Sequence, residues 1–176
     1  LIEPGYYGTD YTGTAYNSDY TSGRMNTDDK ISWTYGRFDI RAKLPKGKGS
    51  WPAIWMLGEN ISTVGWPNCG EIDIMEHVGF DDGRIHASIH TEDYNHMNNT
   101  QKSGSTFTET ATDSFHIYSL EWSPTYLRYL IDNESYFFVY NASNGDVAKW
   151  PFDEPQYIIL NLAIGGDGGA GQGIDP

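Results

Sequence analysis

The chain has 176 residues, of which 38% are apolar and 15% aromatic, and this composition excludes a disordered segment, a coiled coil and a collagen-like fibre. Lysine and arginine total 11 against 24 aspartates and glutamates, and the net charge of −13 argues against nucleic acid and membranes as partners. Cys69 is the one cysteine, so neither an internal disulfide nor a multi-cysteine metal site can form.

The start of the chain shows neither an initiator methionine nor a signal peptide. No apolar stretch approaches the roughly 18 residues that a membrane-spanning helix needs. We therefore expect one domain over residues 1–176, a monomer by default, whose natural beginning lies upstream of Leu1.

Alternating apolar and charged residues predict a first strand over residues 37–44. Turn-forming residues at 45–49 then lead into a strand over 50–57, in which Trp51 and Trp55 share one face. Further strands between Gly, Asn, Asp, Ser and Pro clusters are predicted over 70–77, 84–91, 114–122, 126–131, 136–140 and 157–164. Because no window sustains helical spacing of apolar residues, the sequence predicts an all-β sandwich or barrel.

Two polar segments lie outside these strands. Residues 91–113 are rich in Asn, Ser and Thr, which predicts a surface loop with one short strand. Residues 165–173 contain six glycines, a composition that suits either a loop passing close to a ligand or a mobile end of the chain.

Three carboxylates interrupt the predicted strand at 70–77. On a regular strand Glu71 and Asp73 share a face, whereas Glu76, five positions after Glu71, would point into the core with the isoleucines. One extra residue at Met75 or its neighbour, a β-bulge, would bring all three acids to one polar face. Bulges are frequent beside active sites, so this strand is the principal candidate for a functional site.

Neighbouring carboxylates repel one another, so a cluster of three requires a cation, a shared proton or a chemical task. Glycoside hydrolysis is one such task, in which one carboxylate attacks the anomeric carbon and another, about 5–5.5 Å away in retaining enzymes, protonates the leaving oxygen. Calcium binding is the alternative, although Ca²⁺ takes roughly six to eight oxygens and more often a looped backbone. The residues favour catalysis and leave calcium open.

Four segments carry a resemblance to a known family. They read WTYGRFDIRAKLP at 33–45, GSWPAIWMLG at 49–58, WPNCGEIDIME at 66–76 and NLAIGG at 161–166. In this order they resemble glycoside hydrolase family 16, and specifically its laminarinase-like endo-β-1,3-glucanases. The resemblance implies a concanavalin-like β-jelly-roll sandwich of two curved antiparallel sheets, with the substrate in a cleft across the concave one.

The resemblance also implies residue roles. Glu71 matches the family's nucleophile, Glu76 its general acid/base, and Asp73 the assisting carboxylate between them. Trp66 matches a sugar-stacking tryptophan, and its flat apolar face suits the C–H face of a pyranose. The other residues that resemble cleft positions are Trp51, Trp55, His90, Arg24, Asn26 and Asn161. Trp51 and Trp55 fit the core equally well, and Trp122 is assigned to the core.

The predicted strand over 84–91 alternates His86, Ser88 and His90 with apolar residues. The family often has a histidine at the position of His90, near the catalytic acids, whereas we interpret His86 as a structural hydrogen-bond partner. Both histidines and Glu76 are also residue types that bind zinc, but their spacing does not indicate that they converge.

The chain departs from the family in two respects. Members have further strands before Leu1 and after Pro176, which complete the sandwich and a structural Ca²⁺ site, so calcium ligands are expected outside this chain. Laminarinases also usually carry a tryptophan near Asp167, and this chain has none there. The chemistry itself is expected to need no metal and no cofactor.

The sequence as a whole predicts a secreted retaining endo-β-1,3-glucanase whose partner is a laminarin-like β-glucan. Two alternatives remain open. The substrate could be a mixed-linkage β-1,3-1,4-glucan or a marine galactan such as agarose or carrageenan, because several subfamilies share the bulge. The chain could also be a non-catalytic glucan-binding module, since a fold does not by itself confer chemistry.

Overall fold

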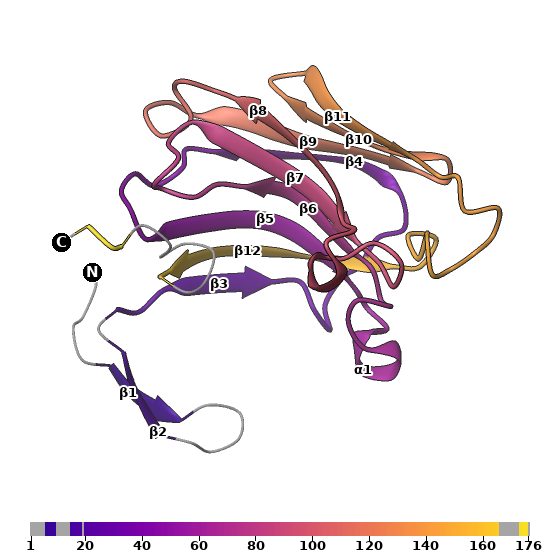
Figure 1. Cartoon of the computed structure of the whole chain (residues 1–176), viewed down its shortest axis with the longest axis horizontal. Coiled ribbons are helices and arrows are strands. Elements are labelled where there is room, and N and C mark those ends of the chain that lie inside the picture. The colour runs from indigo at the N-terminus through magenta and orange to yellow at the C-terminus, as the bar shows by residue number, and fades with distance from the viewer. Residues whose placement is uncertain (1–5, 10–14, 19, 166–172, 176) are drawn as a thin grey trace.

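The computed structural model describes residues 6–9, 15–18, 20–165 and 173–175. Two antiparallel sheets lie face to face, and the two-stranded hairpin β1–β2 extends away from them (Figure 1). The hairpin strands are β1 (Tyr6–Thr9) and β2 (Ala15–Ser18). No helix in the described part of the chain is both long and apolar enough to span a bilayer.

The larger sheet has six strands in the order β3-β12-β5-β6-β7-β8. Its strands are β3 (Gly23–Asn26), β5 (Ser50–Gly58), β6 (Glu71–Glu76), β7 (Arg84–His90), β8 (Lys102–Phe107) and β12 (Gln156–Ile164). The smaller sheet has the order β11-β10-β9-β4. Its strands are β4 (Gly36–Ala42), β9 (His116–Ser123), β10 (Tyr126–Ile131) and β11 (Glu134–Tyr140).

The predicted all-β sandwich is confirmed. The first and last residues of each predicted strand lie within two residues of the ends of an observed strand. The polar segment 91–113 contains the short strand expected there, β8, together with the 3₁₀ turn η1 (His96–Asn98). Five elements were not predicted, namely η1, β1, β2, β3 and the single-turn helix α1 (Ile61–Val64). Most of the glycine-rich segment, residues 166–172, lies outside the described residues, so both interpretations of it stay predictions.

The core lies between the two sheets and follows from the period-two alternation of the strands. From the larger sheet, β5, β6 and β7 contribute buried residues such as Met56, Ile72 and Ile89. From the smaller sheet, Leu120 and Tyr129 are fully buried against them. Alternate residues on these strands therefore point away from the core, and on β6 these are the acidic ones.

Trp122 lies in the core, as predicted. It is 3% exposed, and its indole N–H donates to the backbone oxygen of Phe152 over 3.0 Å, which satisfies its one polar atom. The aromatic rings of Tyr35 and Phe38 pack against it from the start of β4.

Candidate active site

Strand β6 contains the predicted bulge. In its pairing with β5, Ile54 lies opposite Met75 and Trp55 lies opposite Asp73, so Ile74 has no partner on β5. The pairing with β7 shifts over the same residues, with one more residue on β6 than on its neighbour. The extra residue reverses, at one point, the alternation of side chains between the two faces of the sheet. As a result, the consecutive residues Ile74 and Met75 are both buried in the core.

The bulge places all three acids on the outer face of the larger sheet. Glu71, Asp73 and Glu76 line two adjoining cavities, one of about 230 Å³ and one of about 650 Å³. The first lies over β5 and β12, and its other lining residues are Trp51, Ala53, Trp55, Asn161 and Ala163. The second lies over β7 and β8 and is lined further by Trp51, His86, Ala87, Ser88, His90, His96, Gln101 and Ser103. Together they form a cleft that crosses the strands with the acids at its middle.

Each glutamate accepts a hydrogen bond from a tryptophan. The Nε1 atom of Trp66 donates to Oε2 of Glu71 over 2.9 Å, and Nε1 of Trp51 donates to Oε1 of Glu76 over 3.1 Å. Both indoles are half-buried. Trp51 lines both cavities, whereas Trp66 lines neither and reaches the site through its bond to Glu71, so the two carboxylates are held from opposite ends of β6.

Asp73 is buried between the two glutamates and has its own partners on β7. The hydroxyl of Ser88 donates to Oδ2 of Asp73 over 2.5 Å. Nε2 of His90 lies 3.3 Å from the same oxygen and 3.8 Å from Oε1 of Glu71. The alternating polar residues of β7 therefore hold the central acid from the neighbouring strand.

The surroundings of the three acids disfavour the ionisation of all three carboxyl groups at the same time. Burial raises the pKa of both Glu71 and Glu76, and the negative charge of Asp73 raises it further. The hydrogen bonds from Trp66 and Trp51 act in the opposite direction, because they favour the ionised carboxylates. Both glutamates therefore have a raised pKa and retain a proton to higher pH than free carboxyls do, which suits general acid catalysis.

Two of the predicted cleft residues, Trp55 and Asn161, line the first cavity, and Arg24 lies beside Trp55. The indole N–H of Trp55 donates to Oδ1 of Asn161 over 2.7 Å, and the Arg24 guanidinium lies 5.2 Å from the centre of the Trp55 ring. Trp55, like Trp51, therefore lines the cleft. Arg24 and Asn26 line neither cavity, and Oδ1 of Asn26 accepts from the backbone N–H of Asp28.

Residues that the sequence analysis did not single out complete the second cavity. The ring centre of His96, in η1, lies 4.9 Å from that of Trp66 and 5.1 Å from that of His90. Gln101, just before β8, lines the same cavity. Both residues belong to the segment that was expected to be a surface loop. Their place in the cleft follows from the path of this segment in the folded chain, which no local sequence pattern indicates.

One group of side chains could hold a metal ion. Ligand atoms of Glu71, Asp73 and His90 all lie within 4.8 Å of one another. Two carboxylates and an imidazole do not match the all-oxygen set that Ca²⁺ prefers. The zinc set considered from residue types, with His86 and Glu76, is not the one that the described structure brings together.

The chain was compared with known proteins. The model of Glycosyl hydrolases family 16 matches residues 7–175. The chain belongs to this family. A beta-glucanase of Rhodothermus marinus is 48% identical over 164 residues, which cover 90% of this chain and 57% of that protein. A keratan-sulfate endo-1,4-beta-galactosidase of Sphingobacterium multivorum is 40% identical over 153 residues, covering 86% of this chain and 35% of that protein.

Among solved structures, the chain is similar to SCLam, a non-specific endo-beta-1,3(4)-glucanase from family GH16, in a mutant that presents 1,3-beta-D-cellobiosyl-glucose at its active site. The TM-score is 0.86 at 46% identity, over 89% of this chain and 60% of that one. The family 16 jelly-roll fold expected from the sequence is thereby confirmed. The chain spans somewhat more than half the length of these glucanases.

Proposed function

We propose that residues 1–176 belong to one catalytic domain of a retaining endo-β-1,3-glucanase that acts on laminarin-like glucans. The observation that carries this proposal is the bulge in β6, which brings Glu71, Asp73 and Glu76 to the floor of one cleft. A sheet surface with one buried acid between two half-buried acids, and with aromatic walls, matches the requirements of glycoside hydrolysis.

In the proposed reaction, Glu71 attacks the anomeric carbon and forms a glycosyl-enzyme, while Glu76 gives its proton to the departing glycosidic oxygen. Glu76 then takes a proton from water, whose oxygen displaces Glu71 and releases the product with the original configuration. Asp73 contributes a negative charge that keeps the proton on Glu76 until the leaving group needs it. These steps involve no metal and no cofactor.

The shape of the cleft supports endo action. Cavities extend from the acids in both directions, over β5 and β12 on one side and over β7 and β8 on the other. A polymer can therefore occupy both sides of the cleaved bond. Trp66, Trp51 and Trp55 supply flat apolar faces for pyranose rings, and Arg24, His90 and Asn161 supply polar groups for hydroxyls.

The negative charge of the protein supports an uncharged polymer as the substrate. The chain carries a net charge of −13 and its cleft is built around three acids, so a sulfated polysaccharide would meet repulsion that an uncharged glucan avoids. Because polymeric glucans lie outside cells, we propose that the enzyme is secreted. Its structural calcium, if it follows the family, would use ligands outside the present residues.

A second candidate is hydrolysis of a mixed-linkage β-1,3-1,4-glucan or a galactan. It is favoured by the similarity to a non-specific endo-beta-1,3(4)-glucanase and to an endo-1,4-beta-galactosidase. The bulge and the three acids do not separate these substrates, because they act on the bond and not on the sugar hydroxyls that distinguish the polymers.

One experiment separates these candidates. The protein is incubated with laminarin, mixed-linkage β-glucan, agarose and carrageenan, and new reducing ends and product sizes are measured. We expect oligosaccharides of several lengths from laminarin, and no products from a folded Glu71→Gln variant. Faster cleavage of another polymer would move the substrate to the second candidate. Binding of laminarin without products would indicate the non-catalytic module and contradict the proposal.

A further inference from the structure

The outer face of the smaller sheet carries an exposed group of aromatic side chains far from the cleft. Tyr126 on β10 lies opposite Tyr140 on β11, with Phe138 two residues before Tyr140 on the same face. Ring centres are 5.0 Å apart for Tyr126 and Phe138 and 4.3 Å apart for Phe138 and Tyr140. Tyr140 is 69% exposed and Phe138 is 36% exposed, whereas the intervening Val139 is buried.

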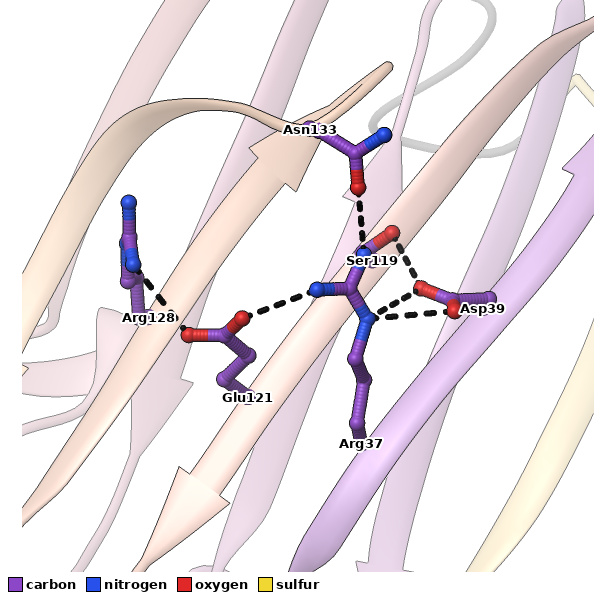
Figure 2. A network of polar contacts seen from close by, with 6 residues as sticks. All are labelled: Arg37, Asp39, Ser119, Glu121, Arg128 and Asn133. Atoms are coloured by element: carbon purple, nitrogen blue, oxygen red, sulfur yellow. Dashed lines mark hydrogen bonds and ion pairs between the residues drawn. The ribbon is translucent and has the colours of Figure 1, made fainter.

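A row of charged residues continues this aromatic group across the whole sheet. Arg37 on β4 lies opposite Glu121 on β9, Glu121 lies opposite Arg128 on β10, and Arg128 lies opposite Phe138 on β11. Figure 2 shows how these side chains connect in one network. The Arg37 guanidinium donates to Glu121 over 2.9 Å, and that of Arg128 donates to Glu121 over 3.3 Å.

The same network extends beyond the row. The Arg37 guanidinium also donates to Asp39 over 2.9 Å and to Oδ1 of Asn133, in the turn after β10, over 2.6 Å (Figure 2). The hydroxyl of Ser119 donates to Asp39 over 2.6 Å. The two arginines and two acids of this network cancel, so the network itself carries no net charge although the chain as a whole is strongly acidic.

We propose that Tyr126, Phe138 and Tyr140, with the adjoining polar network, form a second β-glucan-binding surface. Exposed rings offer flat faces to the C–H groups of pyranoses, and the network presents amide, guanidinium and carboxylate groups to sugar hydroxyls. A polar network whose charges balance suits an uncharged polymer. The network also holds Arg37 and Arg128 in place before binding, which reduces the entropy lost when a ligand is ordered.

The surface lies on the side of the sandwich opposite the cleft, because Leu127 and Val139 on the same strands point into the core that separates the two sheets. A ligand there cannot reach Glu71 or Glu76. Binding at this surface should therefore retain the enzyme on a long or insoluble glucan without changing how a short oligosaccharide is cleaved. The identity of the ligand rests on the proposed function, whereas the location of the surface does not.

The test compares a double variant, F138A together with Y140A, with the parent protein. Retention on insoluble β-1,3-glucan is measured in the Glu71→Gln background, so that the matrix is not degraded. We expect the double variant to lose about tenfold in affinity, corresponding to about 1.4 kcal/mol. In the active background, its kcat/KM on a soluble β-1,3 oligosaccharide should stay within about twofold of the parent.

Two matched variants distinguish the aromatic faces from general effects. Tyr140→Phe keeps the ring and should keep retention. Phe115→Ala removes a ring that is 53% exposed, is contacted by Arg41 and belongs to no aromatic pair among the described residues, and it should also keep retention. Thermal unfolding of all variants shows whether they are folded.

Two results would overturn the inference while leaving the proposed function intact. One is unchanged retention in the double variant together with normal hydrolysis. The other is equal loss in the double variant and in Phe115→Ala. If the double variant instead loses self-association and not glucan retention, the face is a contact between protein copies and the inference is wrong. A parent protein that cleaves no glucan would refute the proposed function separately.

Discussion

Trp66 donates its indole N–H to Glu71 over 2.9 Å, and Trp51 makes the equivalent bond to Glu76 over 3.1 Å. Each bond stabilises the ionised form of one carboxylate, so the two tryptophans adjust the pKa values of the two proposed catalytic glutamates separately. This symmetry makes the roles of the glutamates accessible to measurement, because either indole donor can be removed while an aromatic ring is kept.

Trp66→Phe should raise the pKa of Glu71, because the carboxylate loses a donor that favours its charged form. Since Glu71 must be ionised to act as the proposed nucleophile, the acid limb of the kcat/KM profile should move to higher pH. We expect kcat at the optimum to fall by roughly 10–150-fold, which corresponds to the roughly 1.5–3 kcal/mol of one hydrogen bond to a charged group. The pH–rate profile on laminarin measures both effects.

Trp51→Phe is the matched variant on the other side of the cleft. Loss of its N–H should raise the pKa of Glu76, which must be protonated in the first step, so the alkaline limb should move to higher pH more than the acid limb does. Identical shifts of both limbs in the two variants would contradict separate roles for Glu71 and Glu76.

Ser88→Ala removes the donor that contacts Asp73 over 2.5 Å and leaves a buried carboxylate oxygen without that partner. We expect a loss of stability of roughly 1–3 kcal/mol and a fall of about tenfold or more in kcat, because Asp73 is no longer held between the glutamates. Thermal unfolding and initial rates on laminarin provide the two readouts.

Ser119→Ala is the control for this change. Ser119 is also buried and donates to an aspartate, Asp39, but on the outer face of the smaller sheet. The Ser119→Ala variant should be less stable than the parent protein, and the kcat of its folded fraction should be unchanged. Equal losses of kcat in both serine variants would mean that Ser88 acts only through stability.

Asp73→Asn tests the electrostatic role of the central acid. The amide keeps the size of the side chain and can still accept from Ser88, but it removes a negative charge that raises the pKa of both Glu71 and Glu76. Both limbs of the pH–rate profile should therefore move to lower pH, with kcat at neutral pH reduced by about 10–100-fold. A profile that keeps its position would show that Asp73 acts by hydrogen bonding alone.

Much of this arrangement could be predicted from the sequence because β-strands have a period of two. The alternation in 37–44 and the parity conflict at Glu76 led to the strand and to the bulge, and the structure contains both. Strand β3 escaped prediction because its four residues, Gly23–Asn26, are all exposed and show no alternation in polarity. Its place is set by pairing with the distant β12, which a local pattern cannot reveal.

The cleft residues also include some that a local sequence pattern could predict and others that it could not. Those on regular strands, such as Trp51 and His90, could be placed on a face by counting, whereas His96 and Gln101 reach the cleft through the path of the segment between β7 and β8. Asn26 shares a face of β3 with Arg24, yet only Arg24 has a long enough side chain to approach the Trp55 ring.

The raised carboxyl pKa values also predict how stability changes with pH. A glutamate whose pKa is higher in the folded than in the unfolded protein favours folding when it is protonated, so the unfolding free energy should increase as pH falls through the folded pKa. The gain is complete below about pH 4, where the unfolded carboxyl is also protonated. Above the folded pKa, each buried charge destabilises the fold.

Glu76→Gln removes this destabilising charge at every pH. The variant should unfold about 2–8 °C above the parent protein near pH 8 and at the same temperature near pH 4. Thermal unfolding at the two pH values measures the difference. A variant less stable than the parent near pH 8 would show that the Glu76 charge is compensated in the fold.

In the proposed mechanism, Glu71 and Glu76 act on one glycosidic bond, Glu71 as nucleophile and Glu76 as acid/base. Rescue by azide measures this directly, because the small anion can replace either carboxylate. With an activated β-glucoside oligosaccharide, ¹H NMR should show an α-glycosyl azide from Glu71→Ala and a β-glycosyl azide from Glu76→Ala. The same anomer from both variants, or products with the opposite assignment, would contradict the account.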